Sequence, residues 1–423
     1  MVQPGRNAIA QAFASPRFSW ALAVTSIGTA VFSWAIRSLF GDAGFIGIVA
    51  VLCLFSAATL VARRDELEWQ GLPPLSLLAF LGWSAISIFW SQYQWATLGA
   101  LTYQWSFALL AITVALTRDS IQIVRAFGDV FRVAIAASLA LEIFSGLLID
   151  APIPFLGIEG LLAEGGPIQG LFGTRNQLGI VALLALITFA VELRTRSIVK
   201  TIGVCSVVAA SLTVLLTRSP VILVVAVIVA LATGAIAILR RSTPERRNVL
   251  QWSLAGGTLL TIIVVYFARS PIVNWLNAAS ESEYRIDLWR RLWSIIEIHA
   301  LEGWGWIGVW NIDLPPFVIL RAVGGTPYRS ALNGFMDAWL QLGAVGATLI
   351  ILLMGLTFVR TWILASRKAT STIVWGALIM VALVCVSLVE SDVISGMGWF
   401  VLVVCSVRAA QQLSWRGKFA ERP

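Results

Sequence analysis

Apolar segments of membrane-spanning length recur along this chain from Phe18 to Ala409. An α-helix needs about 20 mostly apolar residues to cross the hydrocarbon core of a bilayer. The segments that approach this length are residues 18–36, 44–62, 74–90, 97–117, 129–149, 175–193, 199–217, 219–239, 250–268, 334–359, 371–390 and 394–410. The sequence therefore predicts an all-α integral membrane protein with about 12 transmembrane helices, folded as a single polytopic domain over residues 1–423.

The composition supports this fold class. Of the 423 residues, 58% are hydrophobic and 12% are charged, whereas soluble domains carry about 25% charged residues. The four cysteines lie far apart within the apolar segments, and the chain has a single histidine. We therefore interpret the cysteines as packing residues and expect no disulfide framework, metal site or cofactor.

One long stretch, residues 269–333, interrupts the apolar rhythm. With 12 spans, 21 of the 30 Lys and Arg residues fall on the side of the membrane that holds both termini, and 9 fall on the other side. Because cytoplasmic loops carry an excess of Lys and Arg, we expect both termini in the cytoplasm. Residues 269–333 then form an extracytoplasmic loop between transmembrane helices 9 and 10, and residues 150–174 form a smaller outer loop.

The long loop contains a pattern typical of an amphipathic helix. Ser280 or Ser282 can cap its start, and Arg285, Trp289 and Ile296 follow at helical spacing. Such a helix can simply lie at the membrane interface. Alternatively, Arg285 points into a cavity that opens toward the outer leaflet.

Two further arginines lie at span ends on the same predicted side. Arg175 occurs in GTRNQLG and Arg218 in TRSP. Arginine can snorkel to the interface, but the positive-inside rule disfavours it on this side. A guanidinium binds phosphate through two parallel hydrogen bonds. Arg175, Arg218 and Arg285 therefore indicate an anion-binding cluster, and a lipid-linked diphosphate is a suitable anion.

Carboxylates near the spans are the other scarce group. Asp337 follows the long loop, Glu142 lies in the fifth predicted span, and Glu390 and Asp392 lie near the last turn. Intramembrane carboxylates are candidates for function, although each can also be the partner of an arginine. His299 lies beside a GWGW turn, where a lone histidine is more often structural.

The order of these motifs resembles a known family. GTRNQLG, TRSP, YRIDLWRRLWSIIEIHALEGWGW and ALNGFMDAWLQLGAVGATLI follow one another between about residues 165 and 355, as in the O-antigen ligase and polymerase family of bacterial membrane proteins. The resemblance implies a multi-pass protein of the bacterial cytoplasmic membrane that transfers a glycan from a polyprenyl diphosphate carrier to an acceptor hydroxyl. It also implies that Arg175, Arg218 and Arg285 bind the diphosphate, without a metal ion.

One position departs from the family pattern. The family usually has His-Asn at the start of the span after the long loop, and the histidine is held to be the base that activates the acceptor. This chain has Leu332-Asn333. We consider Asp337, His299 and Asp287 as replacement bases, because leucine cannot accept a proton. The residues expected to line the glycan path are Asn333, Trp289, Trp293, Trp304 and Trp306.

The leading hypothesis is a metal-independent glycan transferase, either a polymerase or a ligase. Its expected partners are a polyprenyl diphosphate-linked oligosaccharide, a glycan, lipid or other hydroxyl acceptor, and membrane lipids, but no nucleic acid. The first alternative is a transporter or flippase of an anionic lipid-linked saccharide. The second is a non-catalytic member of an envelope polysaccharide complex, which the leucine at position 332 makes more plausible.

Overall fold

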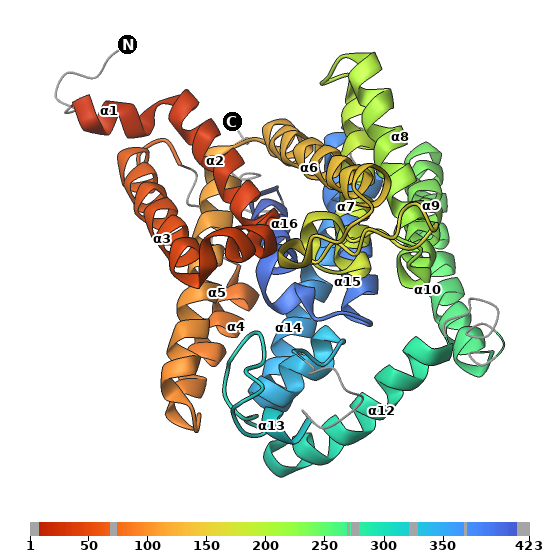
Figure 1. Ribbon diagram of the computed structural model, residues 1–423. Coiled ribbons are helices and arrows are strands. Elements are labelled where there is room, and N and C mark those ends of the chain that lie inside the picture. The colour runs from red at the N-terminus through yellow and green to blue at the C-terminus, as the bar shows by residue number, and fades with distance from the viewer. Residues whose placement is uncertain are drawn as a thin grey trace.

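The computed structural model describes residues 8–67, 74–268, 271, 279–320, 329–367 and 370–412. These residues are mainly helical and form no β-strand; an isolated antiparallel bridge joins Ile153 and Ile158. The predicted all-α class is therefore confirmed for the described part of the chain. Figure 1 shows the helices gathered into one bundle.

Most of the α-helices coincide with apolar segments of the sequence, except α1, α12 and α13. In chain order they are α1 (Ala8–Ala14), α2 (Pro16–Val31), α3 (Ser33–Ala62), α4 (Leu75–Ile86), α5 (Gln94–Thr117), α6 (Ser120–Ile143), α7 (Arg175–Thr195), α8 (Lys200–Leu216), α9 (Pro220–Arg241), α10 (Pro244–Phe267), α12 (Ala279–Ile296), α13 (Phe317–Leu320), α14 (Gly334–Arg367), α15 (Thr372–Ser387) and α16 (Gly396–Gln412). Short 3₁₀ or π-helical turns are η1 (Ser87–Phe89), η2 (Phe144–Leu148), η3 (Pro154–Leu156), η4 (Gly170–Phe172), η5 (Glu297–His299) and η6 (Asp392–Ile394).

Among the described residues, seven helices are long and apolar enough to cross a membrane. They are α3, α5, α6 with η2, α7, α9, α10 and α14. Three shorter apolar helices are α4 with η1, α8 and α15. Together with the composition, they make this a membrane protein, while the count of about 12 crossings stays a prediction.

The first two predicted spans, 18–36 and 44–62, are divided differently in the structure. Helix α2 ends at Val31, and α3 begins directly afterwards at Ser33. Residues 37–43, expected as a connection, are part of α3, and Gly41 bends that helix with a φ of 69°. Glycine adopts this conformation without the penalty that a Cβ imposes, so the bend replaces the expected loop.

The centre of the bundle is formed by helices from the second half of the chain. α15 contacts α14, α9 and α7, while α16 packs on α5 and α14. Nearly every side chain of α16 between Met397 and Val407 is buried. These late helices are enclosed by α2, α5 and α6 on one side and by α7 and α9 on the other, with α8 packed on the outside of α7 (Figure 1).

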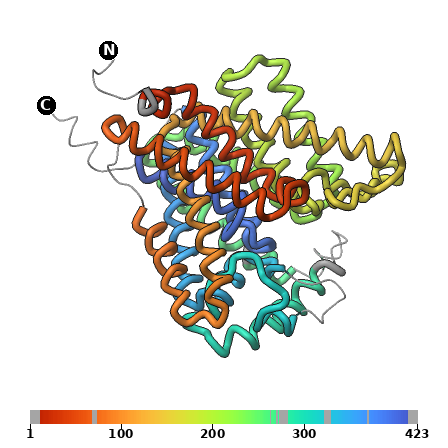
Figure 2. The backbone as a smooth tube through the Cα atoms, turned by 60° about the vertical axis from the view of Figure 1, so that its left-hand side comes forward, coloured from red at the N-terminus to blue at the C-terminus, as the bar shows by residue number. Residues whose placement is uncertain are grey.

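The two ends of the bundle differ in character. We call the end that carries the starts of α7, α9 and α14 the loop face, because residues 279–320 and 329–333 lie beside it. In Figures 1 and 2, α12 and α13 lie at the lower edge, far from α1 at the top. At the opposite end, arginines hold the helices together: Arg118 donates to Pro16 O at 2.5 Å, and Arg408 donates to the Ser120 hydroxyl at 3.0 Å.

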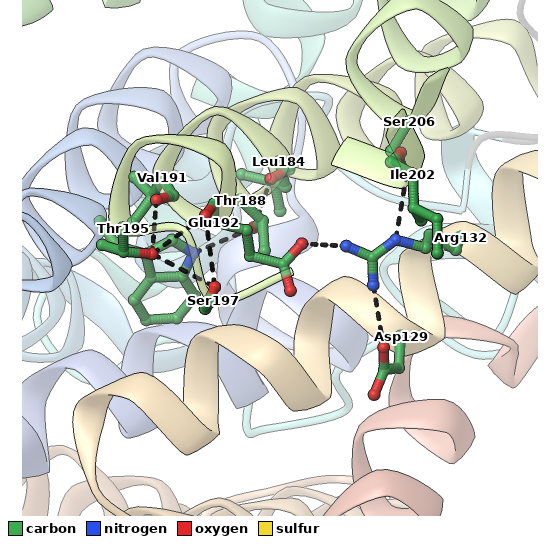
Figure 3. A network of polar contacts seen from close by, with 11 residues as sticks. Asp129, Arg132, Leu184, Thr188, Val191, Glu192, Thr195, Ser197, Ile202 and Ser206 are labelled. Atoms are coloured by element: carbon green, nitrogen blue, oxygen red, sulfur yellow. Dashed lines mark hydrogen bonds and ion pairs between the residues drawn. The ribbon is translucent and has the colours of Figure 1, made fainter. Parts of the chain in front are cut away.

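An ion cluster with a buried glutamate and a half-exposed aspartate joins α6, α7 and α8 (Figure 3). Arg132 of α6 pairs with Glu192 of α7, and it also contacts Asp129 Oδ1 at 2.8 Å and the Ser206 hydroxyl of α8 at 3.1 Å. A Cβ at Gly128 would lie 2.5 Å from Glu192 Oε1, so the carboxylate packs directly against the backbone of α6. This cluster fixes the helix on which Arg175 is located.

The smaller loop, residues 150–174, is fastened to the end of α6. Glu142 Oε1 accepts hydrogen bonds of 2.7 Å from the backbone amides of Gln169 and Gly170. The Ser138 hydroxyl accepts a third, at 3.2 Å, from the amide of Leu171. Glu142 is therefore a structural anchor that sets the backbone just before α7 begins.

The described part of the long loop has its own hydrophobic core. Side chains of α12, α13, the turn after η5 and the start of α14 form most of it, together with Tyr93 just before α5. Its buried members include Leu288, Leu292, Trp310, Phe317 and Leu340. α12 is thus confirmed as an amphipathic helix that buries one face. Residues 269–270, 272–278 and 321–328 of the predicted loop lie outside the described residues.

Candidate functional site

Four polar side chains from four segments form a continuous chain of contacts at the loop face. Arg285 Nη2 of α12 lies 3.5 Å from Glu390 Oε1, in the turn between α15 and α16. The same oxygen accepts a 2.8 Å hydrogen bond from Asn176 Nδ2 at the start of α7. Asn176 Oδ1 in turn accepts a 2.8 Å hydrogen bond from the Ser219 hydroxyl. We call Arg285, Glu390, Asn176 and Ser219 the polar junction.

The polar junction connects the three segments that carry the predicted phosphate-binding arginines. Arg285 is itself a member, Arg175 directly precedes Asn176, and Arg218 directly precedes Ser219. Their exposure differs: Arg285 is buried, Arg175 is half-buried and Arg218 is exposed. The three predicted arginines therefore differ in exposure. Each lies in the polar junction or directly before one of its members.

Arg218 also lies against the smaller loop. A Cβ at Gly165 would be 3.3 Å from Arg218 Nη2, and the amide of Ile168 donates to Leu216 O at 3.3 Å. Arg218 has a φ of 49°, an uncommon left-handed conformation for a residue with a Cβ. Residues 150–174 thus pack on the turn that presents this arginine.

Three helices begin near these residues, and each has a side-chain cap. Thr174 caps α7 through the amide of Gln177, Ser219 caps α9 through the amide of Ile222, and Asn333 caps α14 through the amides of Phe335 and Met336. The amino terminus of a helix carries a partial positive charge. These ends add to the charge of the arginines, so the loop face favours an anion.

The carboxyl groups of the turn between α15 and α16 are perturbed. Burial raises the pKa of Glu390, while hydrogen bonding to Asn176 and the charge of Arg285 act in the opposite direction. Burial, together with the neighbouring Glu390 charge, raises the pKa of Asp392 to about 7. Glu390 is therefore a carboxyl group held beside a cation at only 11% side-chain exposure.

Asp337, a predicted base, accepts hydrogen bonds that connect the long loop to α14. It is fully buried, and its Oδ1 accepts hydrogen bonds from Trp310 Nε1 at 2.7 Å and Gln341 Nε2 at 2.8 Å. Its Oδ2 accepts a bond from the amide of Ala331 at 3.2 Å. The carboxylate thus ties the long loop to α14 from both sides, and its role as a base stays a prediction.

His299 and Asp287 lie on more exposed parts of the long loop. His299 Nδ1 is 2.8 Å from Glu302 Oε1, and this hydrogen bond lowers the pKa of Glu302. Asp287 pairs with Arg291 one helical turn later, at 3.0 Å, with about half of each side chain exposed. Among the described residues, no group of three or more His, Cys, Asp and Glu side chains could hold a metal ion.

Leu332 and Asn333 lie between α12 and the turn that carries Glu390. Trp289 Nε1 donates to the carbonyl of Ala331 at 2.9 Å, on one side of Leu332. Asn333 Nδ2 donates to the carbonyl of Leu388 at 3.0 Å, on the other side. Leu332 itself has a φ of 49°. The position that departs from the family pattern is therefore fixed next to the polar junction.

The other predicted lining residues have different surroundings. Trp293 is 47% exposed and meets Trp339 edge to face, with ring centroids 5.5 Å apart. Trp304 donates to Ile295 O at 3.1 Å. Trp306 is 1% exposed and packs edge-on against Phe80, so it contributes to the core of the bundle.

Comparison with known proteins supports one family. The family model described as O-antigen ligase matches residues 205–351. This match confirms the resemblance to the O-antigen ligase family. The matched region contains Arg218, α12 with Arg285, and the first half of α14. No curated protein matches the chain.

The match to the O-antigen ligase family model indicates an enzyme that transfers glycans at a membrane. It also indicates lipid-linked oligosaccharides and glycan acceptors as the general class of partners. Two members of the polar junction, Asn176 and Ser219, were not expected from the sequence. The sequence could have indicated them, because each directly follows one of the proposed arginines.

Proposed function

We propose that this protein transfers a glycan from a polyprenyl diphosphate carrier to an acceptor hydroxyl at the extracytoplasmic face of a bacterial cytoplasmic membrane. The observation that carries the proposal is the polar junction, which joins the segments bearing Arg175, Arg218 and Arg285. Three arginines supported in this way suit a group with two phosphates.

In the proposed reaction, the acceptor oxygen attacks the anomeric carbon of the carrier-linked sugar. The bond between that carbon and the diphosphate oxygen breaks, and its electron pair stays on the diphosphate. Positive charge around that oxygen stabilises the charge that develops in the transition state. The anomeric configuration inverts, and polyprenyl diphosphate is the leaving group.

The placement in the membrane follows the charge distribution of the sequence. The loop face is assigned to the outside, where lipid-linked sugars are displayed, and both termini to the cytoplasm. The aliphatic surfaces of the long apolar helices would contact the isoprenoid tail. Trp289, Trp293 and Trp304, together with Asn333, are the side chains we assign to the sugar path.

The arginines provide the direct test. We expect Arg285→Ala and Arg218→Ala each to lower transfer by at least about a hundredfold, because each removes charge stabilisation from the leaving group. Purified protein would be given a labelled polyprenyl diphosphate oligosaccharide, and products would be resolved by chain length and by attachment to an added acceptor. Longer chains identify a polymerase, and a labelled acceptor identifies a ligase.

Arg290→Ala is the matched control, because Arg290 is an exposed arginine on the same helix. It should retain transfer close to the wild-type rate. If Arg218→Ala and Arg285→Ala both retain full activity, the arginines do not bind the diphosphate.

A further inference from the structure

The structure leaves the acceptor-activating group of the proposed reaction unassigned. Leu332 occupies the position where the resemblance leads us to expect a histidine. Asp337 is enclosed by three hydrogen bonds. Asp287 pairs with an exposed arginine, and His299 is bonded to Glu302 on a more exposed part of the long loop. The base must therefore be sought among groups that reach the polar junction.

Glu390 lies beside that position. Asn333, the residue after Leu332, donates a 3.0 Å hydrogen bond from its side chain to Leu388 O. Leu388 precedes Glu390 by two residues, so this bond ties position 333 to the turn that carries Glu390. A Cβ on Gly334 would be 3.6 Å from the backbone oxygen of Glu390. The start of α14 and the carboxylate-bearing turn are therefore in direct contact.

The Glu390 carboxyl group is also oriented toward the proposed diphosphate site. Its Oε1 is 3.5 Å from Arg285 Nη2 and accepts a hydrogen bond from Asn176. Both side chains of the Arg285–Glu390 pair are 11% exposed, so the group is largely shielded from solvent yet accessible. A base needs this combination of fixed position, limited hydration and access to the acceptor.

We propose that Glu390 is the base that activates the acceptor hydroxyl, in the place of the missing histidine. The proposal rests on the transferase function proposed above. A Glu390 oxygen accepts the acceptor's proton while the acceptor oxygen bonds to the anomeric carbon and the diphosphate leaves with the electron pair of the broken bond. The protonated carboxyl group then releases its proton to solvent.

The charged surroundings agree with this assignment. Facing Glu390 are Arg285 from α12 and Asp392 in its own turn, with the neutral Asn176 from α7. The contacts from α14 and α9 are made by Gly334, which approaches the backbone of Glu390, and by Ser219 through Asn176. Burial raises the pKa of Glu390. The transfer rate should increase as pH rises through this raised pKa, because only the ionised carboxylate can accept the proton.

The test measures the rate at saturating carrier and the affinity for the carrier separately. Glu390→Gln should lower kcat at least about a hundredfold. It should leave the Kd for geranylgeranyl diphosphate, an unreactive probe of the arginines, within threefold of wild type or make binding tighter. The rise of kcat with pH should disappear. Glu159→Gln, which neutralises an exposed carboxylate of the smaller loop, should behave as wild type.

A second variant separates chemistry from folding. Histidine tolerates left-handed backbone better than most residues, so Leu332→His is compatible with the φ of 49° at this position. Leu332→His added to Glu390→Gln should recover at least tenfold of the lost kcat, because it restores a base beside the same site. Thermal unfolding of each variant in detergent verifies that it is folded.

The outcomes are distinct. If Glu390→Gln keeps kcat and weakens diphosphate binding, Glu390 only positions Arg285 and the base assignment is wrong. A lower kcat with an unchanged pH profile also overturns it. If the wild-type protein transfers no glycan from a labelled polyprenyl diphosphate oligosaccharide to any acceptor, the proposed function fails, whatever the variants do.

Discussion

At the scale of single residues, burial and hydrogen bonding separate carboxylates that look alike in the sequence. Glu142 and Asp337 each accept backbone hydrogen bonds that fasten a loop. Asp287 is in an exposed ion pair, whereas Glu390 is held beside Arg285 in the polar junction. The same side-chain chemistry therefore serves as an anchor, a surface contact or a candidate reacting group, depending on its neighbours.

The anchoring role of Asp337 predicts a loss of stability. Asp337→Asn replaces one acceptor oxygen with a donor amide, so one of the groups from Trp310, Gln341 or Ala331 loses its partner. Leaving a buried polar group unsatisfied costs about 1–3 kcal/mol, and we expect a lower midpoint of thermal unfolding in detergent.

Asp287→Asn is the comparison, because an exposed i,i+4 ion pair contributes only about 0.3–0.5 kcal/mol. Its unfolding midpoint should stay close to that of the wild type. Equal stability of the Asp337 and Asp287 variants would contradict the anchoring role.

At the scale of elements, a bend in α14 packs against the turn that follows α12. Gly343 has a φ of 67° within α14, and the amides of Trp304 and Gly305 donate to Leu340 O and Gln341 O just before it. A Cβ at Gly343 would lie 2.0 Å from Leu301 O. The GWGW turn and the bend therefore fit together only because glycines allow the two backbones to touch.

This fit predicts that two glycines of one helix respond oppositely to alanine. Gly343→Ala should be strongly destabilising, because left-handed backbone costs about 1–2 kcal/mol for an L residue and the Leu301 carbonyl must also move. Gly355→Ala is the control, since nothing lies within 4 Å of its Cβ position.

Helix propensity should make the Gly355 variant neutral or more stable by up to about 1 kcal/mol. Thermal unfolding and the yield of folded protein would be measured for both. Similar stability in the two variants would show that the turn and the bend are not in contact as described.

At the scale of the whole molecule, the two ends of the bundle carry different groups of polar side chains. The end near α1 is held by arginines such as Arg118 and Arg408, in agreement with a cytoplasmic surface. The loop face brings together the starts of α7, α9 and α14 with α12. In the proposed orientation, the polar junction faces the side on which carrier-linked glycans are expected.

The orientation can be measured with single cysteines. In a background with Cys53, Cys205, Cys385 and Cys405 replaced by alanine, Glu159→Cys should react in intact cells with a thiol reagent that does not cross the membrane. Glu245→Cys, at the exposed start of α10, should react only after the cells are opened. The reverse pattern would place the termini outside and contradict the proposed topology.

The sequence by itself determined the helical membrane class, because long apolar segments have few other stable forms in a bilayer. It also singled out Arg175, Arg218 and Arg285, because arginine is unusual at those span ends. It could not predict that α3 would begin at Ser33, since hydropathy averages over a window and does not detect a local break.

Only the tertiary structure decided which polar groups meet. Asn176 and Glu390 are 214 positions apart, and their hydrogen bond exists because the start of α7 and the turn after α15 lie at the same face. The burial of Asp337 and Trp306 likewise depends on packing by distant segments. Side-chain identity sets what each group can do, while its neighbours in space decide which of those roles it takes.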